Sequence, residues 1–248
     1  MELETFLIVC PLVFLAGFVD SVAGGGGLIS VPAYLFAGLP VHQAIATNKL
    51  SAGCGLITAV IRFYKNRLID VPLALVAVPA ALIGAVIGAR LVLMVNEKTT
   101  EYMLVGALVI AAYYTLKKKK VESAEELPRK RVLLTVLLIS FVIGGYDGFY
   151  GPGAGTFLIL AYNSLAKMNI KTAAGNAKVI NLSSNLASLT VFLLSGKVWI
   201  SLGLAAALFS IAGSYIGSGL VIRRGAKIVR PIIIVVLILL FIKVITGF

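Results

Sequence analysis

The sequence predicts an all-α polytopic membrane protein made of two homologous halves. Hydrophobic residues make up 60% of the 248 residues and charged residues 13%, whereas an average soluble protein has roughly 45–50% and about 25%. The apolar residues also gather in runs long enough to cross a bilayer. Distinctive residues of the first half recur at a nearly constant distance in the second half. These observations exclude disordered, secreted disulfide-rich and DNA-binding proteins.

The apolar runs define the predicted elements in chain order. A hydrocarbon core of ~30 Å needs about 20 apolar residues per helix. The runs of the first half cover residues 5–19, 28–39, 41–63, 71–95 and 100–116. Those of the second half cover residues 132–146, 154–166, 172–195, 198–222 and 228–246. We therefore divide the chain into an N-terminal transmembrane repeat (1–116), a basic cytoplasmic linker (117–131) and a C-terminal transmembrane repeat (132–248).

An internal duplication relates the two repeats. At an offset of 127 residues, the first repeat's Phe14, Gly17, Asp20, Gly24 and Gly26 match Phe141, Gly144, Asp147, Gly151 and Gly153. With a small gap, Asn48 and Lys49 correspond to Asn176 and Lys178. Two further glycine pairs, spaced as in closely packed membrane helices, are Gly84 with Gly88 and Gly213 with Gly217. Leucines match by chance in such a chain, so the paired polar and glycine positions carry the argument.

A glycine-rich break interrupts the first element of each repeat. It covers residues 24–27 in the first repeat and 151–155 in the second, where Pro152 and Ala154 are included. Glycine and proline both disrupt helices. A single helix over residues 5–39 would be ~50 Å long, which is too long for one ordinary crossing. Each first element therefore either crosses once as a long broken helix or enters the membrane and returns to the same side.

The positive charges favour the second alternative. Lys and Arg residues are enriched in cytoplasmic loops. One crossing per first element would place 12 of them on the side of the linker and 8 on the other side, whereas returning first elements give 16 and 4. Each repeat then makes an odd number of crossings, which predicts an inverted repeat with both termini outside. Because these charges flank membrane segments, the net charge of +12 indicates a lipid bilayer as partner and no nucleic acid.

Four ionisable residues lie within or beside the apolar runs. Asp20 and Asp147 precede the breaks, and Lys49 and Lys178 follow them. A charge at membrane depth is costly unless it is paired or hydrated, so such residues usually mark a functional site. The structural alternative is a pair of Asp–Lys bridges that only hold helices together.

The breaks predict a buried anion site that is built twice. A helix that begins within the membrane exposes backbone N–H groups and the positive end of its dipole, and glycine lets a ligand approach them closely. Lysine adds full positive charge, and Asn and Ser add neutral hydrogen bonds. The predicted substrate-binding residues are Gly24, Gly25, Gly26, Gly27, Asn48, Lys49, Ser51, Gly151, Gly153, Gly155, Asn176, Lys178 and Asn181, with Ser183 and Ser184 as further hydrogen-bonding candidates. Asp20 or Asp147 is the predicted proton-coupling group, because a buried carboxylate can bind and release a proton.

Two stretches give the chain a family resemblance. They are GFVDSVAGGGGLISVPAYLFAGLPVHQAIATNKL (17–50) and GGYDGFYGPGAGTFLILAYNSLAKMNIKTAAGNAKVIN (144–181). With the duplication and the basic linker, the chain resembles the sulfite exporter TauE/SafE family of membrane permeases. The resemblance implies transport of sulfite, sulfoacetate or other organosulfonates, with the breaks and the Asn–Lys stretches as the site. The second half departs from the first at Pro152, Ala154 and Ala177, so the two halves need not contribute equally.

The residues and the resemblance together predict a secondary transporter of small sulfur-containing anions in the cytoplasmic membrane. The expected mechanism is proton-coupled alternating access. A passive anion channel and a membrane-embedded enzyme or assembly subunit are the alternatives. The sequence shows no catalytic constellation, and with one His and two Cys we expect no metal and no other cofactor. Import, export and the oligomeric state are left open by the sequence.

Overall fold

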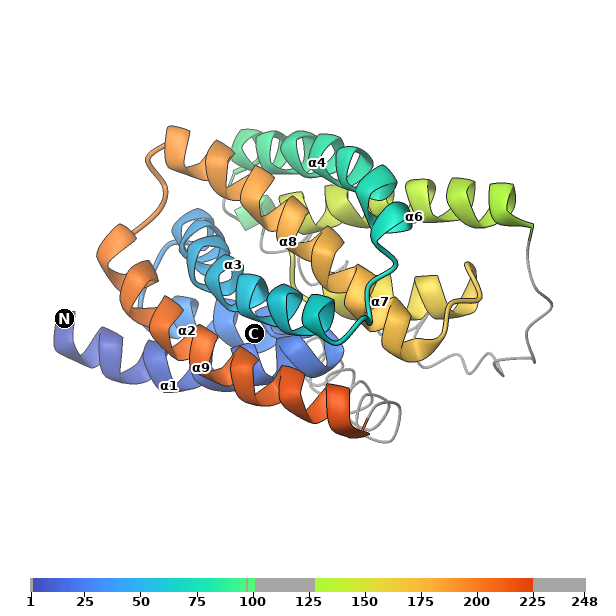
Figure 1. The fold of residues 1–248 in the computed structure, drawn as a ribbon. Helices are drawn as coiled ribbons and strands as arrows, with labels where there is room; N and C mark the ends of the chain where they lie inside the picture. The colour runs from blue at the N-terminus through green and yellow to red at the C-terminus, as the bar shows by residue number, and fades with distance from the viewer. Residues whose placement is uncertain (1, 97, 101–127, 225–248) are drawn as a thin grey trace.

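The computed structural model describes residues 2–96, 98–100 and 128–224, and these residues form helices joined by short turns (Figure 1). The first repeat contains α1 (Glu2–Ala23), α2 (Gly27–Phe36), α3 (Val41–Lys65) and α4 (Val71–Met94). The second contains α6 (Arg129–Phe149), α7 (Ala154–Ser164), α8 (Ile170–Leu194) and α9 (Ile200–Arg224). In this part of the chain, six helices are long and apolar enough to cross a membrane, namely all of these except α2 and α7. The predicted all-α polytopic class is confirmed.

Several predicted elements lie outside the described residues. They are the run 228–246, most of the run 100–116, and residues 117–127 of the linker. Within the described part, α6 begins at Arg129, so the last residues assigned to the linker continue the helix of the second repeat. Arg and Lys are good helix formers whose long side chains can reach the headgroup region, which explains why the charge pattern does not mark the helix start.

Side-chain caps fix the starts of two long helices. Asp70 accepts a hydrogen bond from the backbone N–H of Leu73 at 3.2 Å at the start of α4. Asn169 accepts one from the N–H of Lys171 at 3.0 Å at the start of α8. Such caps satisfy N–H groups that have no partner within the helix. They end the preceding turns sharply and allow neighbouring helices to run side by side.

Each broken first element turns back on itself. Tyr34 of α2 belongs to the same buried cluster as Cys10 of α1, and a Cβ at Gly26 would overlap the backbone of α1. In the second repeat, the Tyr162 hydroxyl of α7 lies 2.6 Å from the Ser140 hydroxyl of α6. These contacts join the return helix to the middle of the helix before it. The chain therefore forms a helical hairpin at each break instead of one long broken helix.

The two repeats interlock through their outer helices. α1 packs along α9, and α4 packs along α6, so the first helix of each repeat lies against the last described helix of the other. At these contacts a Cβ would overlap the partner helix if it were added at Gly84, Gly88, Gly213 or Gly217. The predicted close-packing role of these glycines is confirmed. Small residues allow the backbones to approach in the absence of a hydrophobic driving force within lipid.

Equivalent helices of the two repeats run in opposite directions. Gly84 lies beside Phe141 and Gly88 beside Gly145, so α4 and α6 are parallel. α1 and α9 are parallel in the same way, whereas the short turn between α3 and α4 makes those two antiparallel. In Figure 1, α1 accordingly begins at the left of the bundle and α6 at the right. The inverted repeat with respect to the bilayer stays a prediction.

Charge and apolar surface are distributed as a membrane requires. Leu75, Leu134 and Leu208 are among many large apolar side chains exposed on the flanks of the helices, where lipid would cover them. The helix ends near the α3–α4 turn carry Arg62, Lys65, Arg67, Arg129, Lys130, Arg131, Lys167, Lys171, Arg223 and Arg224. The opposite ends carry Arg90, Lys98 and Lys197. By the positive-inside rule, we expect the first set of ends to face the cytoplasm.

Candidate functional site

The two breaks contact each other where the repeats meet. The N–H of Thr156 donates to the carbonyl oxygen of Gly24 at 3.2 Å, and the Thr156 hydroxyl donates to that of Ala23 at 2.7 Å. A Cβ added at Gly24 would overlap the backbone of Gly155, and Gly24 has a φ of +79°. Only glycine meets both conditions without strain. In this conformation Gly24 and Gly155 pack against each other.

Lys49 of α3 reaches across to the second repeat. Its Nζ donates to Oδ1 of Asp147 at 2.9 Å and to the Asp147 carbonyl oxygen at 2.5 Å. Only 2% of the lysine side chain and 3% of the aspartate side chain are exposed. Gly151 lies beside this pair, and a Cβ there would come within 2.9 Å of Lys49 Nζ. The glycine therefore leaves the space that the ammonium group occupies.

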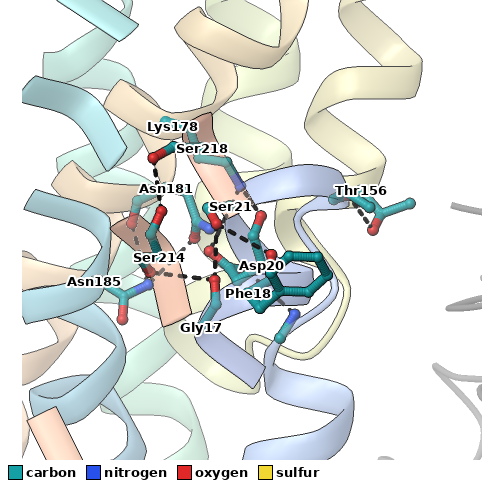
Figure 2. A network of polar contacts seen from close by, with 12 residues as sticks. Gly17, Phe18, Asp20, Ser21, Thr156, Lys178, Asn181, Asn185, Ser214 and Ser218 are labelled. Atoms are coloured by element: carbon teal, nitrogen blue, oxygen red, sulfur yellow. Dashed lines mark hydrogen bonds and ion pairs between the residues drawn. The ribbon is translucent and has the colours of Figure 1, made fainter. Parts of the chain in front are cut away.

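Lys178 of α8 makes the reciprocal contact to the first repeat (Figure 2). Its Nζ lies 3.5 Å from Oδ2 of Asp20 and donates to the Asp20 carbonyl oxygen. Lys178 is fully buried, whereas 15% of the Asp20 side chain is exposed. The Asp20 carboxylate is therefore less completely buried than the carboxylate of Asp147.

The ion pairs connect the repeats crosswise. The sequence singles out all four residues, but it assigns the lysines to the substrate and does not predict their partners. In the described conformation a carboxylate balances the charge of each ammonium group. This is the arrangement predicted by the alternative hypothesis, in which Asp–Lys bridges hold helices together. Buried charges persist only when they are paired and hydrogen bonded. The pairs therefore hold the repeats together at the breaks, whatever further role they have.

The surroundings of the two carboxylates differ. Oδ2 of Asp147 accepts hydrogen bonds from the Ser184 hydroxyl and from Asn185 Nδ2, the latter at 3.1 Å. Oδ1 of Asp20 accepts a hydrogen bond from the backbone N–H of Gly26 at 3.3 Å. Gly26 is the N-cap of α2. The Asp20 carboxylate is thus held by an amide of the break, at the positive end of a helix dipole.

A small cavity lies beside Asp20. Its volume is about 20 Å³, which is room for about one water molecule. Its polar lining comes from Asp20, Gly26, Gly27, Ser30, Asn48, Ser51, Ser210 and Ser214. The structure thus brings Asp20, Gly26, Gly27, Asn48 and Ser51 of the predicted residues together, whereas Gly24, Gly25 and Lys49 are not part of the lining. The cavity is too small for an anion of several atoms, so the described conformation is closed to such a substrate.

Two predicted asparagines have unused hydrogen-bonding capacity. Oδ1 of Asn48 and Oδ1 of Asn176 are buried without a hydrogen-bond partner in the described structure. Most buried polar groups in proteins are paired, and the O and N atoms of an amide exchange places by a rotation. Asn48 lines the cavity. It therefore offers a donor or an acceptor to a ligand there.

The other predicted residues serve local structure in this conformation. The Ser51 hydroxyl accepts from Tyr34 at 2.8 Å, and the Asn181 side chain accepts from Asn185 at 3.2 Å. The hydroxyl of Ser183 donates to the backbone of its own helix. Among the glycines, Gly25 accepts from the N–H of Leu28, Gly27 packs against Pro152, and Gly153 is the left-handed N-cap of α7.

Sequence reasoning missed several polar residues around the site. Ser30, Ser210 and Ser214 line the cavity, and Asn185 holds Asp147. A signal was present, because Ser210, Ser214 and Ser218 recur every four residues and so share one face of α9. The residues described contain no group of three or more His, Cys, Asp or Glu side chains that could hold a metal ion.

The comparisons with known proteins agree with this architecture. The profile of the sulfite exporter TauE/SafE family matches residues 9–244. The chain belongs to the TauE/SafE family. A relative in Escherichia coli strain K12, named probable membrane transporter protein YfcA, is 36% identical over 90% of this chain and 82% of its own. A probable membrane transporter protein of Haemophilus influenzae is 35% identical, over 90% of this chain and 87% of its own.

A Sinorhizobium relative, named probable membrane transporter protein ORF9, extends the similarity to nearly the whole chain. It is 34% identical over 99% of this chain and 94% of its own. No solved structure gives a significant match. This TauE/SafE protein is therefore a multi-pass transporter of the cell membrane, and not an enzyme. The predicted family, the role as a membrane transporter and the location in the cell membrane are confirmed.

Proposed function

We propose that this protein is a secondary transporter of small sulfur-containing anions, such as sulfite, sulfoacetate or other organosulfonates. The name of the family supports the substrate class. The observation that carries the proposal is the meeting of two glycine breaks and two buried Asp–Lys pairs at the contact between the repeats. Amides at a helix start, ammonium groups and asparagine side chains together make a suitable environment for an oxyanion.

Alternating access fits the way in which the repeats interlock. Each repeat presents one break and one lysine to the other, so a movement between the repeats changes both halves of the site together. Transporters with repeats commonly move one repeat against the other around a central site. The closed cavity beside Asp20 corresponds to a state between opening to one side and opening to the other. Asp20 or Asp147 carries the coupling proton.

Uptake into liposomes tests this proposal. Purified full-length protein is reconstituted, a proton gradient is imposed, and accumulation of labelled sulfite and sulfoacetate is followed. We expect accumulation above the external concentration, which a passive channel cannot achieve. Lys178→Ala should abolish it, whereas Lys197→Ala, which alters an exposed lysine in the α8–α9 turn, should leave it intact. Uptake equal to that of empty liposomes for every sulfur anion would reject the proposed substrate class.

A further inference from the structure

The Asp20 carboxylate lies where the proposed site would hold its anion. Its Oδ1 accepts the Gly26 N–H at the start of α2, and its Oδ2 faces the Lys178 ammonium group. These are two of the groups that the sequence assigns to the substrate. We propose that Asp20 is a tethered occupant of the anion site, and that a substrate anion replaces it only when a proton neutralises its carboxyl group. This inference rests on the proposed function.

The charge balance requires the proton. The closed site holds one ammonium and one carboxylate, so its net charge is zero. An added anion would leave an uncompensated negative charge among buried groups, which is strongly unfavourable. If one proton from solution binds to an Asp20 carboxylate oxygen, the Lys178 and Gly26 donors turn to the anion and the net charge stays zero. One proton therefore binds with each monovalent anion.

The cavity and Asn48 show where the incoming anion makes contact. The cavity adjoins Asp20 and the start of α2, and about 20 Å³ of space is already present there. Withdrawal of the carboxylate would enlarge it. Asn48 lines the same cavity and is 94% buried, with a side-chain oxygen that lacks a partner. An amide with unused capacity at this position points to a ligand other than Asp20.

The groups around Asp20 leave it as the site of protonation. Among the described residues, Lys178 of α8 is the charged partner of Asp20, whereas Lys49 of α3 pairs with Asp147. The hydroxyl of Tyr34 on α2 reaches the cavity only through Ser51. The other polar groups that line the cavity, from α2, α3 and α9, are Ser30, Asn48, Ser51, Ser210 and Ser214, and they carry no charge. A proton taken up here therefore goes to Asp20.

The second pair is not equivalent. Lys49, Ser184 and Asn185 occupy both carboxylate oxygens of Asp147, and 3% of that side chain is exposed, against 15% for Asp20. The sequence encodes this difference. When α3 and α8 are aligned on their lysines, Gly55 and Leu56 stand where α8 has Ser184 and Asn185. A glycine and a leucine cannot hold a carboxylate, so Asp20 is free to exchange.

A binding titration against pH tests the inference. The probe is methanesulfonate, a monovalent organosulfonate whose acid group stays ionised from about pH 6 to about pH 8, and the sample is purified full-length protein. Because one proton should bind with each anion, the apparent Kd should rise about tenfold per pH unit over this range. Asp20→Asn should bind with a Kd that does not change with pH. Asp147→Asn should keep the slope, whatever its absolute affinity.

Two controls keep the outcomes distinct. Asp70→Asn makes the same chemical change at an exposed helix cap and should behave as the unmodified chain. Proton uptake in weak buffer should reach one proton per bound methanesulfonate in the unmodified chain, a measurement that needs no variant. If Asp147→Asn does not fold, Asp147→Asn combined with Lys49→Met removes both charges and should again keep the slope.

Each contrary result has its own meaning. No binding of methanesulfonate, sulfoacetate or sulfite at any pH would overturn the proposed function. Binding with a Kd that is independent of pH, or without proton uptake, would overturn the inference and leave the proposed function standing. If the slope of the apparent Kd against pH is lost in Asp147→Asn and kept in Asp20→Asn, the exchange takes place at the Lys49–Asp147 pair instead.

Discussion

The ammonium group of Lys49 donates hydrogen bonds to Asp147, which lies 98 residues further along the chain, and both side chains are buried. Because the donor belongs to one repeat and the acceptor to the other, this contact is part of the interface between the repeats. Its energetics are those of a buried ion pair, in which the loss of one partner is costly and the joint replacement of both is much less so.

The first prediction concerns the stability of this pair. Lys49→Met should lower the free energy of unfolding by about 3 to 5 kcal/mol, because Asp147 is left as a buried, unbalanced charge. Combination with Asp147→Asn should recover at least half of the loss. Unfolding by SDS in mixed micelles measures both. Lys65→Met, at the exposed end of α3, is the control, and a double variant as unstable as Lys49→Met would contradict the pairing.

The second prediction concerns the contact between the breaks. Gly24→Ala adds a methyl group that overlaps the backbone of Gly155 and also forces a left-handed φ of +79° on alanine. Gly38 has a similar φ of +86°, but a Cβ there meets nothing within 4 Å. Gly38→Ala should therefore cost only the backbone strain, about 1 kcal/mol, and Gly24→Ala clearly more. Equal losses in thermal unfolding would show that the breaks do not touch.

The third prediction concerns the unpaired amide. Asn48→Ala should weaken binding of sulfoacetate about tenfold, because a hydrogen bond to a charged ligand is lost. The stability of the protein should change little, since the Asn48 side-chain oxygen has no partner in the closed state. Calorimetric titration provides the affinity. Asn66→Ala alters an exposed asparagine at the end of α3, and its affinity should equal that of the unmodified chain.

The fourth prediction concerns orientation in the membrane. In a chain whose Cys10 and Cys54 are replaced by alanine, Lys197→Cys should react with an impermeant thiol reagent added to intact cells. Lys65→Cys should react only after the membrane is opened, because the basic ends of the helices face the cytoplasm. Both positions are exposed. Labelling of both cysteines from outside would exclude the inverted repeat. The reverse labelling pattern would mean that the basic ends of the helices face the outside.

Much of this architecture could be read from the sequence. Hydropathy located the long helices, and the repeated Asp, Gly and Lys positions identified the breaks and the four buried charges. Partners were harder to predict. The pairing of Lys49 with Asp147 depends on how two repeats pack, and no local pattern records that. Gly24 shows the same limit, because a glycine that meets another backbone and a glycine that meets a ligand have the same sequence signature.

The departures at Pro152, Ala154 and Ala177 indicated that the two halves need not be equal, but they did not show how the two ion pairs differ. That difference depends on Ser184 and Asn185, which resemble any polar residues of a membrane helix until their contact with Asp147 is known. Ser210 and Ser214 lie on α9, far along the chain from the cavity they line. A duplicated sequence suggests two equal sites, whereas the side chains around them have made the sites different.

The crosswise pairing has a consequence for biosynthesis. When the ribosome has completed the N-terminal repeat, Asp20 and Lys49 are already in the bilayer, and the residues that neutralise them have not been translated. The helices of the N-terminal repeat must then remain loosely packed and hydrated beside the translocon until α6 and α8 are synthesised and inserted. Neither repeat should accumulate when it is expressed alone, and the two should rescue each other when they are produced together as separate polypeptides.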